Sequence, residues 1–457
     1  MDLAKPNPRV WALALAVGVV LADSSIVVLA LPDIYRDLDT SVFGVTWVLV
    51  SFNLVMALAA VPAAMVARRV GPGRAAAVGL AIFAGAGLAC GVSDQLSTLL
   101  VARAVQAVGG ALAVTAALEL LPATVGSERR ATAVWATAGA TGAALGPALG
   151  GILTQLVSWQ SIFLLQVPVA LVAAVPILAV ARHEMSTRVI EREVSRTGRP
   201  HLWANVALAM VSASIAAALF LLVLLLIEGW RLSPIGAAIV VSMMPLAALV
   251  GSRLGGWVED ARARAVAGAL LLAGGLGALA LLPKAEVVLT LPPQALIGVG
   301  LSLVLSALTE TALSGRAPQA IHGGWTISAR HAGVVVGLLA LTPVFTHDIA
   351  VQQKEAINAG TAVILESPIR PTVKLGLAKK ISEHLETEDG KVPNLGHVFD
   401  PLPEDEGERS EVVELRSELQ DQLDRGATHA FSPSFGIAAL IALLALFPIG
   451  LARRLDL

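Results

Sequence analysis

Twelve apolar runs, each long enough to cross a bilayer as a helix, limit the folds open to this 457-residue chain. A bilayer core about 30 Å thick needs roughly 20 apolar residues in a helix, because every backbone N–H and C=O must be hydrogen-bonded inside the segment. Only 14% of the residues are charged, against about 25% in an ordinary soluble domain. This composition excludes a soluble globular protein. The twelve runs are 11–31, 44–66, 75–93, 99–121, 131–154, 162–181, 203–227, 234–256, 264–282, 289–313, 326–347 and 432–452.

The formal net charge of −2 hides an uneven distribution. Residues 348–431 hold 17 acidic and 9 basic residues, a net charge of −8. The remaining residues therefore carry +6 and are sparsely charged. An acidic, polar insert thus separates the last two apolar runs of a slightly basic chain. The single cysteine, Cys90, lies in an apolar run, so neither a disulfide framework nor a cysteine-based metal cluster is expected.

The arginines of the short loops predict the orientation in the membrane. They concentrate after the second, fourth, sixth, eighth and tenth runs and at the C-terminus, whereas the short loops on the other side have only Arg36, Arg231 and Lys284. Lys and Arg in short loops stay on the cytoplasmic side. We therefore expect a multi-pass protein of the cell membrane with both termini cytoplasmic and residues 348–431 outside. The first run lacks a small-residue cleavage site, so a retained helix is expected rather than a signal peptide.

An internal repeat predicts how the helices are grouped. An offset of 191 residues aligns Gly109 with Gly300 and Glu119 with Glu310, and it pairs the fourth run with the tenth. We expect an all-α membrane protein of two six-helix pseudo-repeats. The predicted parts are a first half at 1–181, a cytoplasmic linker at 182–201, a second half at 202–347 and 432–457, and the insert at 348–431.

Three motifs resemble the major facilitator superfamily, and within it the drug:proton antiporter branch. Asp23–Ile34 reads DSSIVVLALPDI, similar to the branch signature L-D-x-T-I-V-N-V-A-L-P-x-I, and Arg103–Gly110 reads RAVQAVGG, similar to R-x-x-Q-G. The fifth run contains a complete match to the antiporter motif, formed by Gly142, Gly146, Pro147, Gly150 and Gly151. The resemblance implies a twelve-helix transporter that works by alternating access, with a large external loop between its last two helices.

One loop departs from the family pattern. The loop after the second run normally reads G-x-x-x-D-R-x-G-R-K, but Arg68 stands where the family has its aspartate. The corresponding loop of the second half keeps an acid at Asp260. In the family this aspartate pairs with neighbouring helices and holds the cytoplasmic side closed. The resemblance therefore implies that this contact between the halves is altered here.

Asp23 and Arg103 are the strongest candidates for a functional site. A carboxylate in the middle of a membrane helix costs about 2.5–3.5 kcal/mol, so Asp23 should face a water-filled cavity or a partner. A carboxylate there can bind a proton, and Arg103 can tune its ionisation or bind an anionic group of the substrate. Gln106 and Asn53 are expected to line the same cavity. The alternative is a purely structural role for Asp23 as a hydrogen-bonding group and for Arg103 as a clamp.

Charged residues at helix ends are candidates for gating. Glu119 and Glu310 repeat at equivalent helix ends near arginines, and Arg330 lies beside His331. Together with Arg68 and Asp260, these residues are expected to close the cytoplasmic gate. The alternative is that they simply face solvent or headgroups.

The acidic insert remains open to two interpretations. Val412, Leu415, Leu419 and Leu423 are spaced for one apolar face of a helix within 408–425. A small, partly ordered cap that packs on itself or on an extracytoplasmic protein partner fits this pattern, and so does a solvated insertion without a role.

The favoured function is proton-coupled export of amphipathic, drug-like or lipid-like small molecules. The chain shows no G-x-x-x-x-G-K-[ST] loop for a nucleotide and no HExxH or GxSxG pattern, so neither ATP-driven transport nor an enzyme is expected. We expect the lipid bilayer, protons and a small-molecule substrate as partners, with no cofactor and no nucleic acid. An importer or uniporter of a small metabolite and a transporter-derived receptor or scaffold stay as alternatives.

Overall fold

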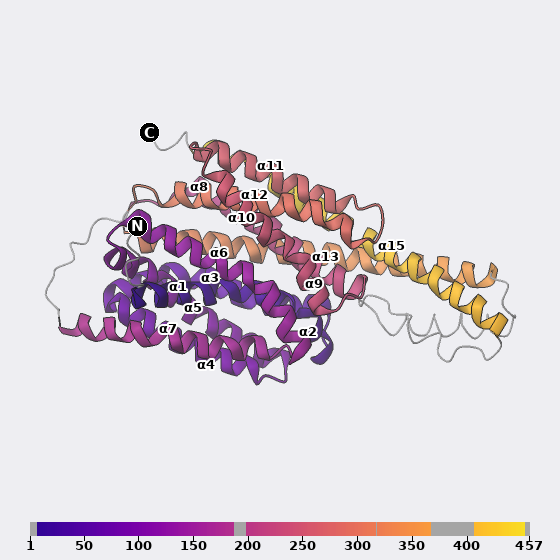
Figure 1. Cartoon of the computed structure of the whole chain (residues 1–457), viewed down its shortest axis with the longest axis horizontal. Helices are drawn as coiled ribbons and strands as arrows, with labels where there is room; N and C mark the ends of the chain where they lie inside the picture. The colour runs from indigo at the N-terminus through magenta and orange to yellow at the C-terminus, as the bar shows by residue number, and fades with distance from the viewer. Residues whose placement is uncertain (1–6, 187–197, 317, 367–405, 453–457) are drawn as a thin grey trace.

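The computed structural model describes residues 7–186, 198–316, 318–366 and 406–452, which form a long helical bundle (Figure 1). In chain order the helices are α1 (Pro8–Val28), α2 (Leu31–Asp37), α3 (Val42–Val70), α4 (Pro72–Gly91), α5 (Leu96–Val125), α6 (Glu128–Leu156), α7 (Ser161–Ser186), α8 (Leu202–Leu224), the π-helix η1 (Leu225–Gly229), α9 (Pro234–Val241), α10 (Met243–Gly255), α11 (Ala261–Ala280), α12 (Val287–Leu313), α13 (Gln319–Glu366), α15 (Glu406–Leu444) and α16 (Leu446–Leu451). The first and last described residues lie at one end of the bundle, which we call the terminal end. Helices α13 and α15 project from the opposite end, which we call the hairpin end.

Twelve spans in the described part of the chain are long and apolar enough to cross a membrane, and each overlaps one predicted run. The seventh span consists of α8 and η1, the eighth of α9 and α10, and the twelfth of the end of α15 with α16. Proline accounts for several helix starts, as at Pro8, Pro72 and Pro234, because its fixed φ suits the first turn and its missing N–H needs no partner there. The prediction of twelve membrane helices is confirmed.

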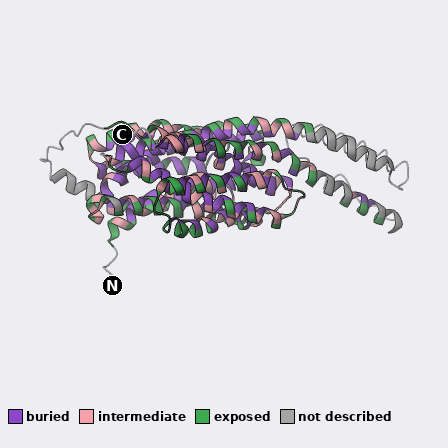
Figure 2. Ribbon diagram, turned by 90° about the horizontal axis from the view of Figure 1, so that it is seen from above, coloured by how far each residue is buried: buried purple, intermediate pink, exposed green. Residues whose placement is uncertain are grey.

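The surface of the bundle is apolar where a soluble protein would be polar. Within the spans, Ile239 is 70% exposed, Leu58 68% and Val101 66%. Figure 2 shows buried residues along the inside of the bundle and exposed ones along its outer faces. The fully buried set includes Asp23, Arg103 and other polar residues. Apolar groups outside and polar groups inside suit a protein whose surroundings are lipid.

Glycine contacts confirm the two pseudo-repeats. A Cβ added at Gly142 of α6 would collide with the carbonyl oxygen of Gly18 in α1. In the second repeat, a Cβ added at Gly333 of α13 would collide with the carbonyl oxygen of Ala209 in α8. Both residues of the second pair follow those of the first by 191 positions, the offset predicted from the sequence. The first and fifth spans of each repeat therefore cross at equivalent points.

The middle helices repeat in the same way. Gly109 of α5 meets Gly79 of α4, where an added Cβ would lie 2.6 Å from the Gly79 oxygen. Gly300 of α12 meets Gly268 of α11, again at 2.6 Å. Such close approach needs residues without a Cβ, and it fixes the position of α5, which carries Arg103.

The insert begins and ends as continuous helix. Residue 348 lies inside α13, which runs to Glu366, and residue 431 lies inside α15, which starts at Glu406. The predicted helix within 408–425 is confirmed as part of α15, and its apolar positions Val412 and Leu415 are buried. In its described parts the insert thus consists of helical extensions of the last two spans, seen on the right of Figure 1. Residues 367–405, the side chains of Leu419 and Leu423, and linker residues 187–197 lie outside the described part.

Candidate functional site

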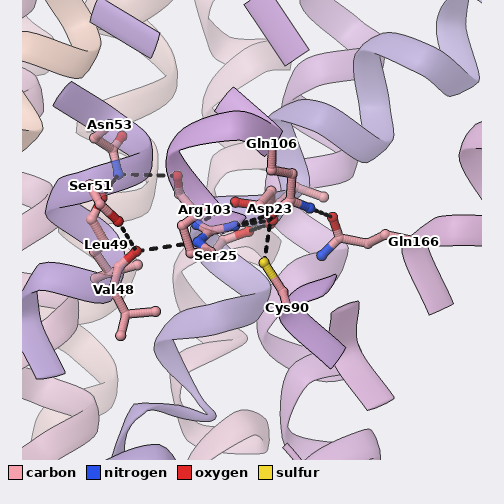
Figure 3. Close-up of polar contacts among 12 residues, drawn as sticks. Asp23, Ser25, Val48, Leu49, Ser51, Asn53, Cys90, Arg103, Gln106 and Gln166 are labelled. Atoms are coloured by element: carbon pink, nitrogen blue, oxygen red, sulfur yellow. Dashed lines mark hydrogen bonds and ion pairs between the residues drawn. The ribbon is translucent and has the colours of Figure 1, made fainter. Parts of the chain in front are cut away.

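Asp23 of α1 and Arg103 of α5 form an ion pair in the interior of the bundle (Figure 3). The guanidinium donates through Nη1 to Oδ1 at 2.8 Å, and Nη2 lies 2.7 Å from Oδ2. Neither side chain is exposed to solvent. Two contacts between a planar guanidinium and a carboxylate are the geometry that best compensates the desolvation of both charges. The sequence predicted that both residues need buried partners, and the structure makes each the partner of the other.

Arg103 has further partners besides Asp23. Its Nε donates to the carbonyl oxygen of Val48 at 3.2 Å, and its Nη1 also donates to Gln106 Oε1 at 2.7 Å. The guanidinium carbon lies 4.3 Å from the ring centre of Phe52 and 5.4 Å from that of Phe163. Cations are attracted to aromatic faces at these distances. The guanidinium is therefore held on several sides, and only one of them depends on the carboxylate.

Gln106 extends the polar network away from the ion pair. Its Nε2 donates to Gln166 Oε1 at 3.2 Å, and the thiol of Cys90 donates to its Oε1 at 3.7 Å. Gln166 Nε2 in turn donates to the carbonyl oxygen of Ile162. Gln106 was predicted near the site from its position one turn after Arg103, whereas Gln166 was not predicted. An amide in the otherwise apolar run 162–177 was the signal that would have found it.

Asn53 links the two repeats. Its Oδ1 lies 2.6 Å from Nδ1 of His331 on α13, and its Nδ2 donates to the carbonyl oxygen of Leu49 at 2.8 Å. Asn53 belongs to α3 and is fully buried. The predicted cavity residue thus lies at a contact between the repeats, close to the ion pair.

The predicted gating acids have partners within their own repeats. Arg68 lies 3.7 Å from Glu119, and Arg264 pairs with Glu310 at 2.5 Å. Asp260 caps the start of α11 by accepting from the N–H of Arg262 at 3.1 Å. Where the family has an aspartate, this chain thus has an arginine whose acidic partner is on α5.

Other residues, which the sequence analysis did not single out, join the repeats at the ends of the bundle. At the terminal end, Gln319 of α13 contacts Thr132 at 3.4 Å and Glu128 at 3.5 Å, both on α6. At the hairpin end, Arg36 pairs with Glu228, and Gln155 accepts from the N–H of Ile235 at 2.9 Å. The repeats therefore touch at both ends, and the ion pair between these ends is closed off from solvent. Arg330 neighbours His331 on α13.

The glycines of the antiporter motif pack on two helices. An added Cβ at Gly142, Gly146 or Gly150 would meet α1 at Gly18, Ser25 and Ile26. Gly151 instead faces the second repeat, with the carbonyl oxygen of Pro234 2.6 Å from an added Cβ. Pro147 lies inside α6. Most of the motif therefore brings α6 against the helix that carries Asp23, and its last glycine brings α6 against α9.

Twelve spans, two pseudo-repeats and a polar site buried inside the bundle define a membrane transporter fold. A family model described as the Major Facilitator Superfamily matches residues 13–342, and this chain belongs to that family.

Three proteins named for resistance or export are similar to this chain over part of its length. The chain is 35% identical over 189 residues to the "Tetracenomycin C resistance and export protein" of Streptomyces glaucescens, covering 40% of this chain and 35% of the relative. It is 37% identical over 175 residues to the "Methylenomycin A resistance protein" of Bacillus subtilis, covering 36% and 38%. It is 32% identical over 246 residues to the protein of that name from Streptomyces coelicolor, covering 52% and 48%. The chain thus matches about a third to a half of the length of these relatives.

A solved structure matches the whole fold. The inward-facing, unoccupied structure of a bacterial homolog to the human lysosomal transporter Spinster aligns with a TM-score of 0.59 and 17% identity, covering 98% of this chain and 99% of that one. At this identity the likeness concerns the fold alone.

Proposed function

We propose that this chain exports amphipathic, drug-like or lipid-like small molecules in exchange for protons, by alternating access of a central site. The observation that carries the proposal is the buried ion pair of Asp23 and Arg103, at 2.7 Å and without solvent contact. The names of the relatives, which refer to resistance and export, support the direction and the class of cargo.

Asp23 is the proposed proton site. Its charge is tolerated in the apolar interior because Arg103 compensates it. A proton that binds to Asp23 removes this attraction, and a cargo that competes for the carboxylate or the guanidinium does the same. Proton and cargo would then exclude one another, which is the requirement for exchange.

Arg103 can remain in place while Asp23 is protonated. The carbonyl oxygen of Val48, the amide oxygen of Gln106 and the face of Phe52 already contact the guanidinium. These groups lower the cost of leaving a buried cation without its carboxylate. The site therefore supports both protonation states of Asp23, and Gln106 and Asn53 complete its polar lining.

Alternating access requires two halves that move relative to each other and contacts that open and close between them. Residues 1–181 form one half, 202–347 with 432–457 the other, and 182–201 the linker, with both termini cytoplasmic and 348–431 outside the cell membrane. The residues proposed to close or steady the cytoplasmic end are Arg68, Glu119, Asp260 and Glu310. Arg330, beside His331 on α13, is proposed to act in gating from inside the bundle. The residues proposed to form the deformable contact of α6 are Gly142, Gly146, Pro147, Gly150 and Gly151.

The test is transport by purified protein in proteoliposomes, with ethidium as the probe cargo. A one-unit pH gradient supplies about 1.4 kcal/mol per proton, or a tenfold concentration ratio of cargo at a one-to-one stoichiometry. We expect the wild type to concentrate ethidium on the side that supplies protons. Asp23→Asn should abolish this accumulation while it keeps exchange of ethidium for ethidium.

The controls separate coupling from folding. Asp23→Glu keeps a carboxylate and should retain part of the accumulation, and Asp94→Asn removes an exposed carboxylate and should change nothing. Accumulation by Asp23→Asn at the wild-type level would refute the assignment of Asp23. Accumulation in the opposite direction in the wild type would instead favour import.

A further inference from the structure

The contact between Asn53 of α3 and His331 of α13 joins the two repeats in the middle of the bundle. The two atoms in contact, Asn53 Oδ1 and His331 Nδ1, are 2.6 Å apart. The amide nitrogen of Asn53 faces two oxygens, the Leu49 carbonyl at 2.8 Å and Ser24 Oγ at 3.4 Å. Since the nitrogen is used in this way, Oδ1 is the acceptor and Nδ1 of His331 carries the hydrogen.

The same segment of α3 contacts the ion pair. Phe52 lies beneath the guanidinium of Arg103 at 4.3 Å and meets the ring of His331 edge-on, with ring centres 6.4 Å apart. The carbonyl oxygen of Val48 accepts from Arg103 Nε. One helical stretch, Val48–Asn53, thus contacts the Asp23–Arg103 pair on one side and the second repeat on the other.

The close contact of α3 with α13 continues toward the terminal end. An added Cβ at Gly324 would lie 3.1 Å from the carbonyl oxygen of Ala60. Gly324 precedes His331 by seven residues, and Ala60 follows Asn53 by seven. The two helices therefore run antiparallel in register over two turns, with the Asn53–His331 hydrogen bond as the polar contact of this stretch.

The charged groups near His331 are few. Arg330 is its neighbour on α13, and Asp23 and Arg103 lie beyond Phe52. Between Val42 and Ala67, α3 carries no charged residue, and neither does α8. The Asp23–Arg103 pair is thus linked to this contact through Phe52, which touches both the guanidinium and the ring of His331.

We infer that His331 is a positioning residue whose hydrogen bond to Asn53 holds the repeats closed and weakens when Asp23 loses its charge. Without its carboxylate, Arg103 depends more on Val48 and Phe52, which lie on the same turns of α3 as Asn53. A shift of these turns changes the geometry at Asn53 Oδ1. The weakening of this hydrogen bond when Asp23 loses its charge rests on the proposed proton site. Its role in holding the two repeats together, here called the clasp, does not.

The experiment measures how often the repeats separate at the terminal end. Spin labels on Arg69→Cys in the first repeat and Ser314→Cys in the second report this distance by double electron–electron resonance in nanodiscs, since both positions are exposed and the native Cys90 is buried. Loss of one buried hydrogen bond should raise the population of separated molecules about 2- to 10-fold in His331→Leu. Asn53→Ala should do the same. His331→Asn, which keeps an N–H donor near the position of Nδ1, should restore the wild-type distribution, and Val336→Ala, on the exposed face of α13, should leave it unchanged.

The outcomes distinguish the inference from the proposed function. Equal distributions for wild type, His331→Leu and Asn53→Ala would overturn the clasp, as would equal shifts in His331→Leu and His331→Asn. In an Asp23→Asn background, we expect His331→Leu to cause little further increase in the population of separated molecules, because the Asn53–His331 hydrogen bond is already weakened. Fully additive effects would overturn the link to Asp23, whereas a failure of proton-driven transport alone would leave the clasp intact.

Discussion

Substituting Gly79 by alanine tests the close packing that positions the helix of Arg103. An added Cβ at Gly79 would lie 2.7 Å from the nitrogen of Ala113 and 2.7 Å from the oxygen of Gly109, whereas ordinary contacts begin at 3.4 Å. The shortfall of about 0.7 Å involves backbone atoms of α5, so a side-chain rotation does not relieve it. We expect α4 and α5 to move apart and Arg103 to shift relative to Asp23.

The same helix offers a matched control. An added Cβ at Gly85 meets nothing within 4 Å, and this position is exposed. Replacing a helical glycine by alanine gains about 0.5–1 kcal/mol of stability through backbone entropy, while overpacking costs about 1–3 kcal/mol. Gly85→Ala should therefore stabilise by about 0.5–1 kcal/mol, and Gly79→Ala should destabilise by about 0.5–2 kcal/mol. Two identical substitutions on one helix are thus expected to have opposite signs.

The assay is unfolding of the purified protein in mixed dodecylmaltoside and SDS micelles, followed by the fluorescence of its 8 tryptophans. The midpoint should move to lower SDS for Gly79→Ala and to higher SDS for Gly85→Ala. Equal shifts of both variants in the stabilising direction would refute the close α4–α5 contact and, with it, our account of how α5 is positioned.

Two further predictions concern groups outside the central site. Arg68→Glu and Glu119→Arg should each lower stability by up to about 1 kcal/mol in the same assay, and the double exchange should recover the loss; no recovery would show that the 3.7 Å contact is not a working ion pair. Burial raises the pKa of Asp33 above its usual 3.8, although Arg36 lowers it and Asp37 raises it further. The native state therefore binds this proton more readily than the unfolded state, and the contribution of Asp33 to stability should fall as the pH rises above 3.8. Asp33→Asn should remove this contribution, so the difference in stability between variant and wild type should change between about pH 3 and 7, and a constant difference would contradict it.

Features that belong to a single helix were predictable from the sequence. The energy of placing an apolar or charged residue in a bilayer is set locally, so the twelve spans and the functional candidates Asp23 and Arg103 follow from their immediate neighbours. The repeat was also predictable, because Gly109 and Gly300 must each lack a side chain where two helices cross.

Pairings between helices were decided only by the tertiary structure. Asp23 and Arg103 are 80 residues apart in sequence, and Asn53 and His331 are 278 apart. Which side chains meet depends on the rotation and crossing of each helix, and these are fixed by contacts such as Gly79 with Gly109 rather than by any local preference.

The insert, too, was predictable from the sequence in part, while its arrangement was decided by the tertiary structure. Its acidic composition and the apolar spacing of Val412 and Leu415 predicted a helix, but not that this helix would be the continuation of the last membrane span. The local pattern marks where the apolar run ends, but not whether the helix ends there, because the backbone hydrogen bonds continue unchanged from lipid into water. The sequence by itself therefore determined the number of spans, their repeat and the chemistry of the buried groups, and the tertiary structure decided which of those groups meet, since only packing brings distant helices to hydrogen-bonding distance.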